Sequence, residues 1–166
     1  MAERQERTAA DAVLTRIGQV VMLHHAGDRE EARRRLLDLW AEIGEHGEPL
    51  HRCTLAHYLA DTQDDPCDEL AWDLRALSAA DEAEGAAGLR GFYPSLHLNL
   101  AADYVKLGRT EAARSHLHRA RGTAAALGDD GYGDGVRAAI SRLELRLRDD
   151  GDPGADPWGP PRQRPQ

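Results

Sequence analysis

A spaced pattern of glycine, alanine and leucine occurs at two places in the chain and constrains the fold more than any other feature. In each copy an alanine follows the glycine after five residues, and a leucine follows that alanine after four. The copies are Gly27, Ala32 and Leu36, then Gly108, Ala113 and Leu117. Glycine ends helices because it readily adopts left-handed backbone angles, and residues four apart share a helix face. The pattern predicts helical hairpins in which a small residue lets the paired helices approach closely.

The rest of the chain up to residue 148 carries helix signals of the same kind. Apolar residues recur at helical spacing, Asp65 suits a helix cap, and Pro66 after it suits a first helical turn. Helices are expected to begin at or near Thr8 or Asp11, Asp28, Pro49, Asp65, Pro94, Thr110 and Tyr132. Aromatic residues make up only 5% of the chain, so Leu, Ala and Val must fill the core. That composition favours helix packing over a β-sandwich, and we expect an all-α protein.

The helical region is expected to cover residues 1–148, and a tail covers residues 149–166. The tail holds five of the eight prolines together with several Gly and Asp residues, so it cannot bury a core and is expected to be flexible. Trp158 is its aromatic residue. Two interpretations of Trp158 stay open: a docking anchor, or a side chain that is solvated or lies on the domain's own surface.

Charge and hydropathy exclude two classes of partner. The formal net charge is -8, whereas a general nucleic-acid binder needs a basic face. The arginine triplet 33–35 has acidic residues around it and is interpreted as a solvated helix face. No apolar run approaches the roughly 20 residues of a membrane span, and the N-terminus lacks a signal-peptide apolar region. We expect a cytoplasmic protein with no nucleic-acid or membrane partner.

The segment from about Leu96 to Leu127 carries the most specific repeat pattern. Its key positions hold His97, Leu100, Ala101 and Tyr104, followed by Gly108, Ala113, Leu117 and Ala120. This arrangement resembles the tetratricopeptide repeat, whose signature is W-x2-L-G-x2-Y followed by spaced small and apolar positions. The pattern is fainter in the two earlier hairpins. The turn-to-turn spacing also exceeds the family's roughly 34 residues, and the terminal proline is missing.

The resemblance implies a right-handed α-solenoid of three antiparallel helical hairpins, with the seventh helix as a C-terminal cap. The first helix of each hairpin would line a concave groove. The chain looks like the short tetratricopeptide proteins of actinobacteria, and a single lysine among 21 Lys and Arg residues indicates a GC-rich bacterial genome. The family's groove positions, carried over to this chain, fall on His24, Cys53, His57, Asn99, Ala102, Lys106 and Arg137.

The first functional hypothesis is a non-catalytic module that binds a protein or peptide partner in this groove. Asn99 and Lys106 would hold a peptide backbone or carboxylate, and His57 or Arg137 would add a donor. The sequence shows no Gly-rich phosphate loop, nucleophile motif or paired-carboxylate motif. We therefore expect neither an enzyme nor a cofactor.

Two alternatives stay open. One is a homodimer that buries an exposed first-helix surface, which would contain Leu14, Ile17 and Val21. The other is a small-molecule or metal pocket, with or without catalysis, around His24, Cys53, His57, Asn99 and Tyr104. Cys53 and His57 are four residues apart and share a helix face, as zinc or thiol chemistry would require.

Several other side chains have a packing interpretation. Phe92 and Tyr93 either form a ligand-contacting rim or hold the preceding loop against a helix. Trp40 and Trp72 lie on second helices, where packing between hairpins is expected. His116 is interpreted as a surface residue.

Overall fold

The computed structural model describes residues 1–83 and 89–150, and over these residues all regular secondary structure is helical. The long helices are α1 (Ala2–His25), α2 (Arg29–Ile43), α3 (Pro49–Asp61), α4 (Pro66–Glu82), α5 (Tyr93–Lys106), α6 (Thr110–Thr123) and α7 (Gly131–Asp149). Two 3-10 helices, η1 (Arg90–Phe92) and η2 (Ala124–Ala126), precede α5 and follow α6. The expected all-α class is confirmed.

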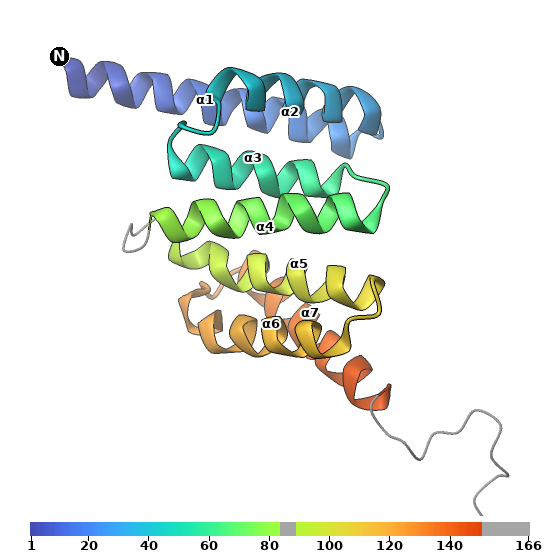
Figure 1. Ribbon diagram of the computed structural model, residues 1–166. Coiled ribbons are helices and arrows are strands. Elements are labelled where there is room, and N and C mark those ends of the chain that lie inside the picture. The colour runs from blue at the N-terminus through green and yellow to red at the C-terminus, as the bar shows by residue number, and fades with distance from the viewer. Residues whose placement is uncertain (84–88, 151–166) are drawn as a thin grey trace, which may run out of the picture.

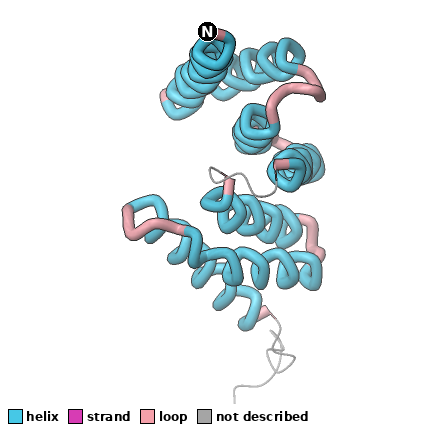
Figure 2. The backbone as a smooth tube through the Cα atoms, turned by 90° about the vertical axis from the view of Figure 1, so that its left-hand side faces the viewer, coloured by secondary structure: helices cyan, strands magenta, loops and turns pink. Residues whose placement is uncertain are grey.

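Each helix packs against the next along the chain, and the connecting turns reverse the direction of neighbours (Figure 1). The most extensive contacts join α3 to α4 and α5 to α6. Figure 2 shows α3 and α4 nearly end-on, between the pair α1–α2 and the pair α5–α6. In addition α1 contacts α3, and α5 contacts α7. A side-chain contact between His57 and Asn99 links α3 to α5. We call the side of the stack that carries these contacts between odd-numbered helices the odd-helix face.

Three clusters of buried apolar side chains follow one another along the stack. The first, from α1, α2 and α3, includes Ile17 and Leu36. The second joins α3, α4 and α5 and includes Cys53 and Leu96. The third joins α5, α6 and α7, with Ile140 at 0% exposure. Each helix thus buries its apolar stripe mainly against helices that are close to it in sequence.

The two repeated glycines form the expected turns. Gly27 and Gly108 have φ angles of 98° and 71°, which residues with a Cβ rarely adopt. The alanines five residues later, Ala32 and Ala113, are both fully buried. The prediction of a turn followed by a close helix contact is confirmed in both copies.

One helix start differs from expectation. The first helix begins at Ala2 rather than at Thr8 or Asp11, because the preceding residues are good helix formers without a breaker. Thr110 is the first residue of α6, and no side chain caps this helix. α6 itself ends at Thr123, and η2 continues the chain to Ala126.

The last helix, α7, ends at Asp149. Trp158 and the rest of the chain after residue 150 lie outside the described residues. No helix in the described part is both long and apolar enough to cross a bilayer.

One arginine of the 33–35 triplet joins two hairpins instead of facing solvent. Arg33 Nε donates to the Thr62 carbonyl oxygen at 2.9 Å, and its Nη2 lies 3.0 Å from Asp64 Oδ2. Only the other two arginines fit the predicted solvated face, where they pair with Glu31 of the same helix. Arg33 therefore ties α2 to the turn after α3.

The aromatic residues pack between helices as expected. The rings of Trp40 on α2 and Trp72 on α4 meet edge to face, with centroids 5.1 Å apart. Phe92 and Tyr93 contact the second core cluster, and Tyr93 Oη donates to Asp81 Oδ1 of α4 at 3.0 Å. The segment before α5 is thus held against α4.

His116 is not a simple surface residue. Its Nδ1 lies 3.1 Å from Nδ1 of His97, and its ring stacks on those of His97 and Tyr104. The interpretation as a solvated histidine is wrong because α5 covers this side of α6.

Candidate functional site

His57 of α3 and Asn99 of α5, both predicted groove residues, meet on the odd-helix face. Asn99 Nδ2 lies 3.2 Å from His57 Nδ1, which is also 4.0 Å from Asp73 Oδ1 of α4. Lys106, seven residues after Asn99, pairs with both carboxylate oxygens of Glu69 at 2.9 and 2.7 Å. The charge of Lys106 is therefore already matched inside the protein.

The other predicted groove residues lie apart from this pair. His24 lines a narrow hollow between α1 and α3 together with Asp61. Ala102 is half-buried on α5. Arg137 donates to the Gly128 carbonyl oxygen at 2.9 Å and so anchors the loop before α7. These residues do not converge on one point.

Cys53 lies in the core and not on the groove surface. Its exposure is 0%, because it belongs to the stripe of α3 that packs into the second core cluster. Burial raises the pKa of its thiol to about 11. In the part of the chain that the structure describes, the grouping of metal-ligating side chains consists of Glu69, Asp73 and Asp103, without His24, Cys53 or His57.

Asp73 and Asp103 are the unexpected members of the site. They lie on the packed helices α4 and α5, with 2% and 1% exposure. Glu69 precedes Asp73 by one helical turn, and one ligand oxygen from each of the three acids lies within 4.8 Å of the others. We call these residues the acid cluster. Its member Asp73 lies 4.0 Å from His57 Nδ1.

The surroundings shift the titration of these groups. Burial, and then the hydrogen bond with Asp103, raises the pKa of Asp73 to about 9. Burial likewise raises the pKa of Asp103 to about 7. Burial lowers the pKa of His57, although the nearby charge of Asp61 acts in the opposite direction. These shifts favour the protonated form of Asp73 and the neutral form of His57.

A pocket of about 390 Å³ opens beside His57 on the odd-helix face. Its wall is mainly apolar, and its polar groups come from His57, Tyr58, Ser95 and Tyr132. The remaining lining residues are Gly91, Phe92, Leu96, Ala126, Leu127 and Gly128. Ser95 Oγ and Tyr132 Oη are hydrogen-bonded across the rim. We call this hollow the aromatic pocket. Phe92 thus both lines it and contacts the second core cluster.

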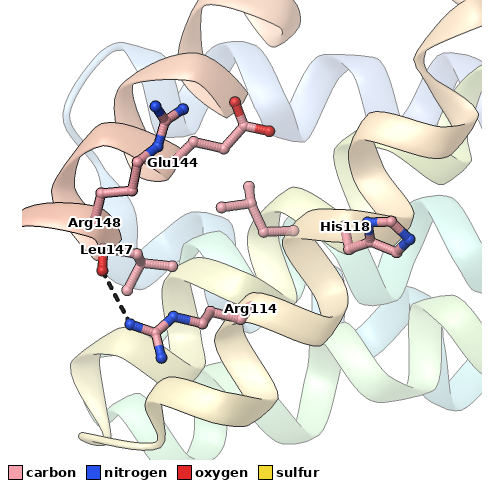
Figure 3. A pocket seen from close by; sticks show the side chains of 6 residues that line it. Arg114, His118, Glu144, Leu147 and Arg148 are labelled. Atoms are coloured by element: carbon pink, nitrogen blue, oxygen red, sulfur yellow. Dashed lines mark hydrogen bonds between the residues drawn. The ribbon is translucent and has the colours of Figure 1, made fainter. Parts of the chain in front are cut away.

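A second hollow, of about 510 Å³, lies between α6 and α7 (Figure 3). Arg114 reaches across it and donates to the Leu147 carbonyl oxygen at 3.1 Å. Glu144 pairs with Arg121 at 2.8 Å. Arg114 and Glu144 are thus already partnered, and the wall of this hollow is more strongly charged than that of the aromatic pocket.

Sequence reasoning missed the acid cluster because Asp103 is far from Glu69 and Asp73 in the chain. A usable signal was nevertheless present. Asp73 shares a helical stripe with the buried residues Ala76 and Ala80, and Asp103 shares one with Leu100. An acidic residue on an otherwise apolar stripe predicts a buried carboxyl group.

Comparisons of the chain with protein-family models, curated proteins and solved structures give no match.

Proposed function

We propose that the protein is a tetratricopeptide-like, right-handed α-solenoid that binds a peptide segment of a partner on its odd-helix face, in the cytoplasm and without catalysis. The hairpins would be α1–α2, α3–α4 and α5–α6, with α7 as the cap. The glycine turns and the packing of consecutive helices support this assignment. The odd-helix face would then be the groove side of the array.

The aromatic pocket is the observation that carries the proposal. Its volume lies within the range of about 300–1,000 Å³ found for ligand-binding pockets. An apolar wall with a few polar groups suits one large apolar side chain, such as Leu or Phe, beside a peptide backbone. Ser95 and Tyr132 at the rim have hydroxyl groups that can bond to that backbone.

The charge near the pocket favours a basic residue next to the apolar one. Asp61 is exposed on α3 and acts electrostatically on the pocket residue Tyr58. Lys106, which was expected to attract a carboxylate, is paired with Glu69. The formal net charge of -8 also favours a basic partner. The ligand we propose is therefore a peptide with a Leu or Phe and a neighbouring Lys or Arg.

Fluorescence anisotropy with labelled hexapeptides tests this assignment. The peptides carry one Phe and one Lys at varied separation, and a control set replaces Lys by Glu. Gly91 lines the aromatic pocket, and a Cβ at this position meets open space. The side chain introduced by Gly91→Leu therefore fills the pocket rim. Gly122→Leu on α6, where a Cβ also has open space, is the matched control.

We expect binding of the Lys peptides that Gly91→Leu abolishes and Gly122→Leu preserves. Asp61→Asn should weaken binding about two- to fivefold, as loss of an exposed ion pair does. No binding by any peptide, or equal binding by the two glycine variants, would refute the proposal.

Self-association through the first helix has less support. Of the three residues named for such a surface, Ile17 is 1% exposed, and Val21 is half-buried. Leu14 is the most exposed of them at 36%. The apolar area that α1 offers there is therefore small.

A further inference from the structure

The acid cluster contains buried oxygen atoms that no donor of the described residues reaches. Asp73 Oδ1 and Asp103 Oδ2 are both buried and both lack a hydrogen-bond partner. A carboxylate buried without a donor or a cation is strongly disfavoured. These two orphan atoms are an observation separate from the closeness of three acidic residues, and they indicate that something positive belongs there.

The nearby donors are engaged elsewhere. His57 Nδ1 faces Asn99 Nδ2 at 3.2 Å and stays 4.0 Å from Asp73 Oδ1. Lys106 Nζ bonds to Glu69 and so lies beside the cluster without reaching either orphan atom. A proton shared between them, a buried water molecule or a bound cation would satisfy the two aspartates.

The geometry suits a single metal ion. Oxygen atoms that ligate one ion at about 2.0–2.6 Å lie no more than about 4–5 Å apart. The ligand oxygens of Glu69, Asp73 and Asp103 fall within 4.8 Å of one another. Glu69 and Asp73 come from α4 and Asp103 from α5, so one ion would join two helices.

The charges also suit a divalent ion. With the proton of Asp73 displaced by the ion, three ionised carboxylates carry three negative charges, Lys106 supplies one positive charge, and a divalent cation would balance the remaining two. Carboxylate oxygen is the ligand that Mg²⁺, Mn²⁺ and Ca²⁺ prefer, whereas zinc and copper sites use imidazole or thiolate. The side chain of Glu69 is 21% exposed, which leaves an entry beside its pair with Lys106.

We propose that Glu69, Asp73 and Asp103 form a site for one divalent cation of this oxygen-preferring class, and that the ion clamps α4 to α5. The site is independent of the peptide-binding proposal, since it lies between helices and not in the aromatic pocket.

Titration of chelator-treated, desalted protein with Mn²⁺ tests the site, with free Mn²⁺ measured by electron paramagnetic resonance. Thermal unfolding in Mg²⁺, Mn²⁺ or Ca²⁺ identifies the preferred ion. Asp73→Asn and Asp103→Asn remove one ligand charge each at nearly constant volume. Asp68→Asn changes the net charge equally at an exposed position of the same helix and is the matched control.

We expect one Mn²⁺ per chain and a melting temperature that rises with cation concentration. Asp73→Asn and Asp103→Asn should each weaken Mn²⁺ binding at least tenfold, while Asp68→Asn should not. Lys106→Gln should strengthen binding severalfold, because it removes a positive charge beside the ion. This last variant keeps all three ligands, so it tests the site even if an aspartate variant fails to fold.

Three results would overturn the proposal. One is the absence of Mn²⁺ binding together with unchanged melting in all three cations. Another is binding that the Asp73→Asn and Asp103→Asn variants retain. The third is binding that Lys106→Gln leaves unchanged or weakens. Any of these outcomes would leave a shared proton or a buried water molecule as the partner of the two aspartates.

Discussion

Replacement of Asp73 by asparagine is expected to stabilise the protein increasingly as the pH rises. Burial and the contact with Asp103 raise the pKa of Asp73 from an ordinary 3.8 to about 9. Between these values the folded state holds a proton that the unfolded state has released. The free energy of unfolding of the wild type therefore falls as the pH rises through this window. The asparagine side chain does not titrate, so the variant lacks this loss.

The expected magnitude follows from proton linkage. One proton held only by the folded state changes the free energy of unfolding by about 1.36 kcal/mol per pH unit. From about pH 5 to about pH 7, the wild type should lose about 2.7 kcal/mol relative to Asp73→Asn. His57 acts in the opposite direction because burial lowers its pKa, but both proteins contain His57. Subtracting the two curves therefore removes most of its contribution.

Urea unfolding followed by circular dichroism measures this difference, with a chelator present so that no cation competes for the carboxylates. The titratable and charged groups that surround Asp73 are Cys53, His57, Asp61, Glu69, Asp103 and Lys106. The variant keeps all of these residues, but Asp103 loses the hydrogen bond with Asp73 that contributes to its own pKa, and Cys53 loses the nearby charge of Asp73. The exposed control Asp68→Asn should give a difference from the wild type that stays nearly constant with pH. A constant difference for Asp73→Asn as well would refute the reasoning.

Three further predictions concern the core. In native protein near pH 8 a thiol reagent should modify the exposed Cys67 but not Cys53, because burial raises the thiol pKa of Cys53 to about 11. Both cysteines should react in denaturant. Leu100→Ala should lower the free energy of unfolding by about 2–5 kcal/mol in urea titrations, because Leu100 is fully buried. Burial, and then the charge of His116, lowers the pKa of His97 to about 4. As the pH falls, His97 should therefore take up a proton in the unfolded chain before it does so in the folded protein. Stability should then fall as the pH drops below about 6.5, and His97→Gln should flatten that part of the curve.

Local signals predicted the elements of this fold well. Gly27 and Gly108 end helices through left-handed backbone angles, and Asp65 caps α4 by accepting from the Cys67 amide at 2.7 Å. These features depend on one residue and its immediate neighbours, so the sequence contains all the information they need. Where a helix starts without a strong cap, as α1 does at Ala2, the same reasoning placed the start too late.

The candidate site was harder to predict because it depends on contacts between helices. His57 and Asn99 were expected in one groove, and they do meet. Cys53 and His57 lie on the same helix, but Cys53 packs into the core. Side chains four positions apart on a helix do not point in the same direction, because a turn takes 3.6 residues. The pairing of Lys106 with Glu69 of α4 depends on how α4 and α5 pack, which no local pattern specifies.

The edge-to-face contact of Trp40 with Trp72 gives the protein a local optical probe. These two indoles join α2 to α4, and Arg75 lies 4.5 Å from the ring of Trp72. With Trp158 replaced by Phe, tryptophan emission would report on this one junction, while far-ultraviolet circular dichroism reports on every helix. In a stack held together by contacts between neighbouring helices, α1 and α2 could unfold while the other helices stay folded. The tryptophan emission would then change while much of the circular-dichroism signal remained. The chain thus reports by its own fluorescence whether it unfolds as one unit or from its N-terminal end.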